Sequence, residues 1–244
     1  MENRKRDVEL VELGSGSCLV VACDSCGAVG SKELDVVQAP PYVVGRYTAR
    51  VALFEVLAAG AVPKAVSVTI SNEPSPTGEE ILQGVRDELK GLDAGNLPIA
   101  VSTEKNMATR QTAAGVTVMG VCRCGELRLA TSKPGDVLYC LGTPKMGNEV
   151  EGPDDATAVR LTHLITMLRW EGIHDIIPVG SKGIQWEAET LADASGRQVV
   201  LDMEQRLNVK KSAGPCSCLV FSCLPGVELP HFDLIPLTKI GKLE

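Results

Sequence analysis

Apolar runs alternate with turn residues along the chain, and their spacing predicts both strands and helices. A helix is predicted over 43–59, because Gly60 and Pro63 follow its apolar stretch as a stop signal. A second helix is predicted from Thr77 to about 90, opened by a capping-box pattern of Thr77 and Glu80. Strands are predicted at 17–23, 65–70, 98–102, 116–121 and 137–141.

The second half of the chain repeats this mixture after a stretch rich in Gly, Pro and acidic residues at 142–155. Helices are predicted over 156–170 and 184–194, and strands around 175–177, 198–201 and 216–223. No internal repeat or low-complexity tract is present. The pattern predicts layered α/β or α+β domains, divided into residues 1–145 and 146–244.

Composition places the protein among ordinary globular chains and argues against nucleic-acid binding. Its 244 residues are 44% hydrophobic and 23% charged. A net charge of -7 disfavours a surface that neutralises many phosphates, and 3% aromatic residues offer few stacking platforms. The one basic cluster, at 4–6, is expected in a frayed amino terminus.

Cysteines and hydropathy predict a cytoplasmic protein without a membrane segment. No run of about 18 apolar residues occurs, and the amino terminus lacks a signal-peptide core. The nine cysteines are then expected to be mainly reduced. Cys122-x-Cys124 and Cys216-x-Cys218 could supply zinc ligands, but packing is the favoured role. A metal or redox role for Cys23 and Cys26 stays open.

Three acidic residues close or interrupt apolar stretches and predict a metal site. Asp24 and Glu104 follow predicted strands, and Glu55 lies in the first helix. Unpaired carboxylates are costly to bury, so acids at a core edge usually pair with a base or hold a cation. Magnesium suits a scattered acidic set, because phosphate and water supply its other ligands. The alternative pairs Glu55 with Arg46 or Arg50.

Two further groups of residues are candidates for binding phosphate. Asn72 and Glu73 follow a predicted strand, where α/β proteins concentrate ligand-binding groups. Gly180, Ser181 and Lys182 precede a predicted helix, whose free amides complement an anion, although plain helix capping is equally compatible. No Walker motif or G-x-G-x-x-G follows a strand, and no hydrolase triad has local support.

Several motifs resemble the aminoimidazole-ribonucleotide synthetase-like superfamily, which includes selenophosphate synthetase and thiamine-phosphate kinase. The run 44–63 resembles the long helix of that family with its Gly-Ala-x-Pro ending. Asp24 matches the strand-end metal aspartate of the family. Residues 103–120 look like its second acidic loop with the next strand, and residues 133–138 look like its Pro-Gly-Asp turn. Residues 175–184 look like a degenerate form of its Asp-x-Ser-Asp-Gly segment, and residues 212–215 look like its late glycine-rich element.

The departures from the family pattern point to a divergent branch. Phe54-Glu55 stands where the family has Asn-Asp, the acidic pair before the first strand is missing, and Glu104 replaces the common aspartate. The combined pattern is most similar to the branch that phosphorylates α-ribazole, a nucleoside used in salvaging the lower ligand of cobalamin. The pattern consists of Asp24-Ser25-Cys26, Gly30-x-Lys32, Glu55, Asn72-Glu73, 76–78, Thr103-Glu104-x-Asn106 and Gln111-Thr112.

This resemblance implies an ATP- and magnesium-dependent kinase of α+β, two-domain architecture. The implied amino-terminal domain binds ATP and forms a homodimer through its sheet, and the acceptor is the primary hydroxyl of a nucleoside. Asp24, Glu55 and Glu104 would be the catalytic, metal-holding residues. The implied cofactor-binding residues are Lys32, Asn72, Glu73, Asn106, Gly180, Ser181 and Lys182.

Three alternatives remain open from the sequence. A selenophosphate synthetase would use a reactive cysteine near a Gly-rich amino terminus, and Cys18 is placed for that role, although its surroundings are apolar. A catalytically silent nucleotide-binding subunit is compatible with the missing acidic pair. A zinc-dependent interaction module would use the close cysteine pairs.

Overall fold

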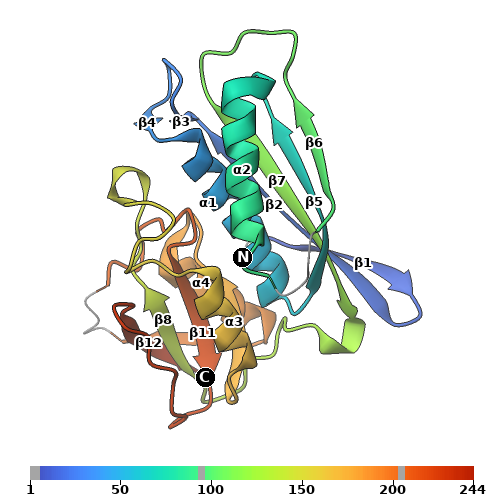
Figure 1. The fold of residues 1–244 in the computed structure, drawn as a ribbon. Coiled ribbons are helices and arrows are strands. Elements are labelled where there is room, and N and C mark those ends of the chain that lie inside the picture. The colour runs from blue at the N-terminus through green and yellow to red at the C-terminus, as the bar shows by residue number, and fades with distance from the viewer. Residues whose placement is uncertain (1–5, 93–96, 203–206) are drawn as a thin grey trace. The chain divides into compact units, whose positions relative to one another are not determined.

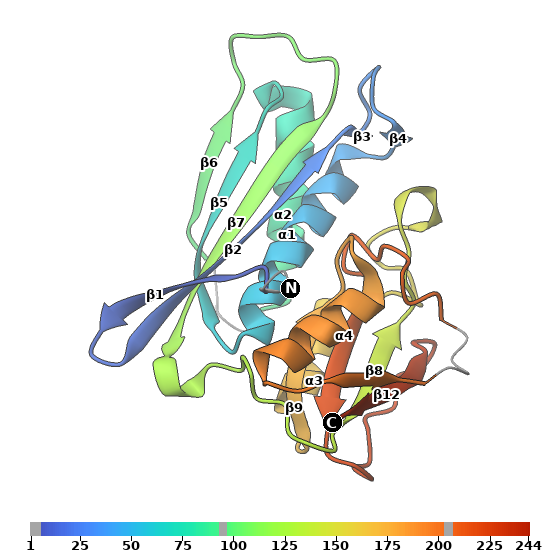
Figure 2. The ribbon, with the colours of Figure 1, turned by 180° about the vertical axis from the view of Figure 1, so that it is seen from behind.

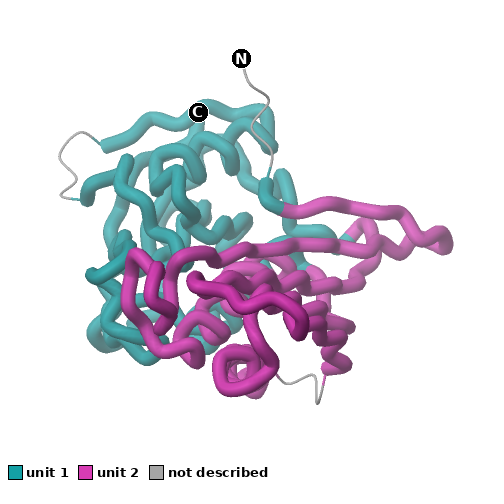
Figure 3. Tube along the Cα trace, turned by 90° about the horizontal axis from the view of Figure 1, so that it is seen from above, with its two compact units in different colours: residues 1–7, 58–60, 126–244 teal, residues 8–57, 61–125 magenta. Residues whose placement is uncertain are grey.

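The computed structural model describes residues 6–92, 97–202 and 207–244, and they form two compact units. Unit 1 consists of residues 1–7, 58–60 and 126–244, and unit 2 of residues 8–57 and 61–125 (Figure 3). The chain passes from unit 2 into unit 1 for the last time between residues 125 and 126, which is earlier in the sequence than the predicted boundary at 145/146. The reason is that β8 (Val137–Gly142) hydrogen-bonds to strands of the carboxy-terminal sheet and therefore belongs to unit 1.

Unit 2 is built on one five-stranded sheet in the order β1-β2-β7-β5-β6 (Figure 1). Its strands are β1 (Glu9–Gly14), β2 (Ser17–Gly27), β5 (Val62–Ile70), β6 (Ile99–Thr103) and β7 (Ala113–Arg123). β7 runs antiparallel to both β2 and β5, whereas β5 and β6 are parallel. The carboxyl ends of β2, β5 and β6 therefore share one edge of the sheet.

Helices α1 (Pro41–Ala58) and α2 (Glu79–Leu89) cover one face of this sheet (Figures 1 and 2). Alternate residues of the strands, such as Val20, Val68 and Val118, are buried on that face. The two helices approach closely through glycines, because a Cβ at Gly45 would lie 2.0 Å from the Ile81 carbonyl oxygen and one at Gly84 2.1 Å from that of Tyr42.

Several ends of the elements in unit 2 differ from the sequence prediction: β5 and β7 each begin three residues earlier than predicted. β2 continues to Gly27, so Asp24 lies inside the strand and not after it. Thr77 does not cap a helix; it lies in a short π-helical turn, η1 (Pro74–Gly78), where its hydroxyl donates to Glu73. β1 and the short strands β3 (Val29–Gly30) and β4 (Val37–Gln38) were not predicted, because they bury too few side chains to show a clear alternation.

Unit 1 has a second five-stranded sheet, in the order β10-β12-β8-β11-β9. Its other elements are β9 (Ile173–Pro178), β10 (Val199–Leu201), β11 (Cys218–Cys223), β12 (Leu237–Leu243), α3 (Leu161–Arg169) and α4 (Gly183–Ala194). All six residues of the central strand β11 are buried. One face of the sheet forms a core with α4, which includes Val220 from β11 and Ile184 and Leu191 from the helix.

The amino-terminal segment is also part of unit 1, which corrects the expectation of a frayed basic cluster. Arg6 is 8% exposed, and its guanidinium bonds Asp175 Oδ1 at 2.5 Å and the Ile176 carbonyl oxygen at 2.8 Å. Residues 4 and 5 lie outside the described residues. Arg6 and Asp175 are 169 positions apart in the sequence, so nothing in the local sequence could reveal this ion pair. α3 begins at Leu161 and is thus shorter than predicted.

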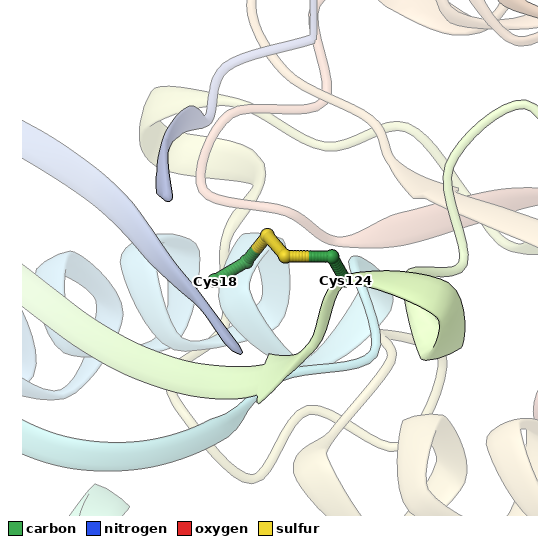
Figure 4. The surroundings of a disulfide bond; sticks show 2 residues. All are labelled: Cys18 and Cys124. Atoms are coloured by element: carbon green, nitrogen blue, oxygen red, sulfur yellow. A yellow bond between two sulfur atoms is a disulfide. The ribbon is translucent and has the colours of Figure 1, made fainter. Parts of the chain in front are cut away.

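Cys18 and Cys124 form a disulfide, which the sequence did not indicate (Figure 4). Their separation of 106 positions hides the pairing from any local motif. The other seven cysteines are not disulfide-bonded, and four of them are buried: Cys140, Cys216, Cys218 and Cys223. Within the described ranges, no helix combines the length and the apolar character needed to cross a bilayer.

Candidate functional site

Three loops at the shared strand edge of unit 2 are fastened to one another by side chains. The loop between β2 and α1 is held by the carboxylate of Asp35, which accepts hydrogen bonds from Lys32 N at 2.7 Å, Thr112 N at 2.8 Å and Thr112 Oγ1 at 2.7 Å. Although burial opposes it, these hydrogen bonds lower the pKa of Asp35. Gly30 is required here, since a Cβ would lie 2.1 Å from Thr112 Oγ1.

Lys32 also connects this loop to the residues that follow β5. Its ammonium lies 2.6 Å from Glu73 Oε2, and the other carboxylate oxygen of Glu73 accepts from Thr77 Oγ1 at 2.5 Å. Burial opposes ionisation of Glu73, but the hydrogen bonds from Lys32 and Thr77 outweigh it and lower its pKa to about 2. Lys32 and Glu73, both predicted to bind the cofactor, thus lie together and form an ion pair.

Asn72 fastens the third loop, which leads from β6 to β7. The side chain is fully buried, and its Nδ2 donates to Thr109 Oγ1 at 2.6 Å and to the Gln111 carbonyl oxygen at 2.7 Å. Its Oδ1 accepts from Ala113 N at 3.0 Å. Both donors and one lone pair are therefore used within the protein, and the geometry gives Asn72 a role in positioning this loop.

Glu104 begins the same loop and is half-buried. Its Oε1 accepts from the backbone N–H groups of Asn106 at 2.6 Å and Met107 at 3.1 Å. These two bonds lower the pKa of Glu104. Glu104 and Asn106 are thus adjacent at the rim of the sheet, with the second carboxylate oxygen of Glu104 left to other contacts.

The predicted metal residues lie on different parts of unit 2. Asp24 is half-buried on the helix-covered face of β2, and Glu55 is 9% exposed within α1. β2 and β6 are three strand steps apart, about 14 Å, which is too far for Asp24 and Glu104 to ligate one ion. In the part of the chain that the structure describes, no three His, Cys, Asp or Glu side chains form a group able to hold a metal. The set does not fit a three-carboxylate metal cage.

Gly180, Ser181 and Lys182 lie in unit 1, where they lead into α4 as predicted. Gly183 has a positive φ of 86°, and a Cβ there would lie 2.7 Å from the Lys211 carbonyl oxygen, so the helix start needs glycine. The Lys182 ammonium lies 4.3 Å from the centre of the Trp186 ring, one turn along the helix. Ser181 and Lys182 are exposed, whereas the backbone N–H groups of Gly183 and Gln185 donate to the carbonyl oxygens of Gly180 and Val209. The segment before α4 therefore offers a cation and an aromatic surface.

Glu187 lies beneath this loop and was not identified from the sequence. It is 9% exposed, its carboxylate accepts a hydrogen bond from Gly180 N, and burial together with the charge of Asp7 raises its pKa to about 7. Lys182 and Arg6 act in the opposite direction. The signal available was an acid on the apolar side of a predicted helix.

Glu88, a buried acid of α2 that pairs with two arginines of α1, was also not identified from the sequence. Arg46 Nε lies 2.6 Å from Glu88 Oε2, and Arg50 Nε lies 2.7 Å from Glu88 Oε1. The alternative drawn from the sequence pairs Glu55 with Arg46 or Arg50 and does not include Glu88. The position of Glu88 on the buried face of α2 made it an available alternative.

Comparison with known proteins agrees with the motifs of the amino-terminal half. Residues 5–122 match the family model described as AIR synthase related protein, N-terminal domain. The matched segment contains β1 to β6 and nearly all of β7, and thus the three loops of unit 2 that side chains fasten to one another. A search of curated proteins finds no match to the sequence.

Solved structures show that the likeness extends beyond that segment. The thiamine monophosphate kinase of Aquifex aeolicus superposes with a TM-score of 0.66 at 16% identity, over 98% of this chain and 88% of that chain. The thiamine-monophosphate kinase of Stenotrophomonas maltophilia gives 0.61 at 17% identity, over 97% and 88%. Phosphoribosylformylglycinamidine synthase II of Thermotoga maritima gives 0.59 at 14% identity, over 98% of this chain and 37% of that one. Both units therefore share the mixed α/β fold of these enzymes.

Proposed function

We propose that this protein is an ATP-dependent phosphotransferase that acts on a hydroxyl group of a small molecule. The observation that carries the proposal is the fold, which matches thiamine monophosphate kinases over nearly the whole of both chains. One structure of such a kinase is described as complexed with AMPPCP, an ATP analogue, and TMP, and the chain covers 86% of it. The three loops of unit 2 that side chains fasten to one another supply a rigid, polar rim of the kind that a nucleotide site needs.

The proposed nucleotide contacts come from these loops and from the start of α4. Lys32 is a half-buried cation of the rim, and a phosphate oxygen would compete with Glu73 for its ammonium. Asn106 and Glu104 would contact the nucleotide beside it, while Asn72 and Asp35 hold the loops in place. Because phosphoryl transfer needs positioning and charge stabilisation and no enzyme nucleophile, a rigid charged rim is the chemistry to expect.

Gly180, Ser181 and Lys182 are the proposed contacts from unit 1. The exposed Lys182 ammonium complements a phosphate group, and the exposed Ser181 hydroxyl can donate to it. Trp186 offers a ring for an aromatic part of a ligand.

Magnesium is proposed as the partner of ATP, without a shared carboxylate cage. The ion takes one or two carboxylates together with phosphate and water oxygens. Asp24 and Glu104 are the candidates to meet such an ion singly, because both are accessible in part. For Glu55, the surrounding core of α1 favours a structural role over the predicted ligand role.

For the acceptor, we propose the primary hydroxyl of a nucleoside, with α-ribazole as the first compound to test. The support is the sequence pattern around Lys32, Glu73 and Glu104, which resembles the α-ribazole branch. The selenophosphate alternative is disfavoured, because the sulfur of Cys18 is bonded to Cys124 and offers no free thiolate. We also propose a homodimer formed through the sheet of unit 2, whose strands expose Leu10 and Val101.

A Glu104→Gln variant tests the site. Its Oε1 can keep both backbone hydrogen bonds, so the fold should persist while ADP release from magnesium-ATP falls at least about tenfold. Glu171→Gln, the same change at an exposed turn residue of unit 1, is the matched control and should keep wild-type turnover.

The outcomes separate the candidate functions. Full turnover by Glu104→Gln would contradict the proposed site, and a collapse of its fold would assign Glu104 to structure. ATP binding without turnover in the wild type would favour a silent nucleotide-binding protein, for which the Lys32–Glu73 pair and the scattered carboxylates provide a rationale.

A further inference from the structure

Three cysteines meet at one end of the β2–β7 pair. Cys18, in β2, is bonded to Cys124, which begins the short 3-10 helix η2 (Cys124–Glu126), and their Cα atoms are 5.2 Å apart (Figure 4). Cys122, the last but one residue of β7, lies directly opposite Cys18 in the antiparallel ladder. Cys122 is half-buried and not disulfide-bonded.

The ladder places Cys122 within disulfide distance of Cys18. Directly opposite residues of antiparallel strands have Cα atoms about 4.5 to 5.5 Å apart and side chains on the same face. Disulfides span Cα distances of about 4.4 to 6.8 Å. Cys23, five residues further along β2, is about 17 Å from Cys18 and cannot compete. Cys18 therefore has two partners in reach.

We propose that Cys18, Cys122 and Cys124 form a thiol–disulfide exchange site with two disulfide isomers. Cys122 loses its proton to water, and its thiolate attacks Cys18 Sγ. The Cys18–Cys122 bond forms as the Cys18–Cys124 bond breaks, and Cys124 leaves as a thiolate that takes a proton from water. The step is an isomerisation, so it consumes no oxidant or reductant. It is independent of the proposed phosphotransfer.

The position of the site gives the exchange a structural consequence. Unit 2 ends at Gly125, directly after Cys124, and the next residue belongs to unit 1. Within unit 1, Arg128 is anchored by its guanidinium to the carbonyl oxygens of Leu168 at 2.6 Å and Ile173 at 3.0 Å. The Cys18–Cys124 isomer thus holds one end of a three-residue connection covalently.

In the second isomer this covalent hold is lost. The Cys18–Cys122 bond duplicates a pair that the ladder already aligns, and Cys124 keeps its backbone bond to the Gly16 carbonyl oxygen, at 2.8 Å. Exchange therefore loosens residues 124–127 without breaking the sheet. Amide exchange at these residues should be faster in the second isomer.

Trypsin separates the two isomers, because the exposed Arg123 lies between the two partner cysteines. Free thiols are first blocked with N-ethylmaleimide at acid pH, and the protein is then digested without reduction. Cys18 is released on peptide 7–32, Cys122 on 111–123 and Cys124 on 124–128. Mass spectrometry then identifies the peptide bonded to Cys18, and fragmentation excludes Cys23 and Cys26.

The wild type incubated at pH 8 should give both cross-linked peptides, and Cys124→Ser in oxidised glutathione should give more than half of Cys18 bonded to Cys122. Cys122→Ser should give the Cys124 cross-link alone, which shows that the fold and the native bond survive a serine at 122. Cys23→Ser should behave as the wild type. The proposal is overturned if Cys124→Ser leaves both Cys18 and Cys122 blocked as thiols, or if the wild type shows one isomer at every pH.

Discussion

Glu187 is the buried group that we expect to control the pH dependence of stability in unit 1. Burial, with the charge of Asp7, raises its pKa from 4.5 to about 7, against the opposing effects of Gly180 N–H, Lys182 and Arg6. The folded state therefore binds the proton more tightly than the unfolded state does. The stabilisation from protonated Glu187 is complete below pH 4.5 and is lost as the pH rises through 7.

The size of this effect follows from the two pKa values. Between pH 5 and pH 8, a shift of this size lowers the free energy of unfolding by about 2 to 3 kcal/mol. Glu187→Gln keeps the shape of the side chain and removes the titration. Relative to the wild type, the variant should therefore gain about 2 to 3 kcal/mol on going from pH 5 to pH 8.

Urea unfolding followed by tryptophan fluorescence measures this change in unit 1, which contains Glu187. Both tryptophans, Trp170 and Trp186, belong to unit 1. Glu189→Gln makes the same chemical change two residues along α4, at a half-buried acid that Gln185 Nε2 bonds at 2.9 Å, and should parallel the wild type. Parallel pH curves for Glu187→Gln and the wild type would refute the reasoning.

Three further predictions concern packing and cross-links in unit 2. Gly45→Ala should lower stability by about 3 kcal/mol or more in circular dichroism melts, because its Cβ would meet the Ile81 carbonyl oxygen; an unchanged melting temperature would mean that the helices separate freely. Glu88→Gln should cost about 3 to 5 kcal/mol in urea titrations, since it removes a buried negative charge that both guanidinium groups contact; a loss under about 1 kcal/mol would contradict this. Cys18→Ser opens a loop of 106 positions and should lower the unfolding free energy by about 4 to 5 kcal/mol in non-reducing denaturant, and equal stability would show that the bond to Cys124 contributes nothing.

Local patterns were sufficient for most of the secondary structure. The helix over 43–59 was predicted within two residues of α1, because Gly60 and Pro63 end it whatever the tertiary context. The strand 98–102 was predicted within one residue of β6. β12 was not predicted, because its Lys239, Gly241 and Lys242 interrupt the apolar alternation while neighbouring strands bury Ile240.

The candidate site was less predictable than the fold. The sequence located the strand-end loops through Asn72, Glu73 and Glu104, because strand ends are readable locally. It could not show that Lys32 would pair with Glu73, 41 positions away, or that Asp35 would fasten Thr112, 77 positions away. Such partners are set by strand order, which puts β7 between β2 and β5, and no local spacing encodes that order.

Product analysis by mass spectrometry tests the proposed phosphotransfer most directly. The protein is incubated with magnesium-ATP and separate acceptors: α-ribazole, common nucleosides, thiamine monophosphate and selenide. The account predicts ADP together with one nucleoside that has gained a phosphoryl group, and loss of that product in Glu104→Gln. ATP binding with no phosphorylated product from any hydroxyl acceptor, or a product from selenide alone, would contradict it.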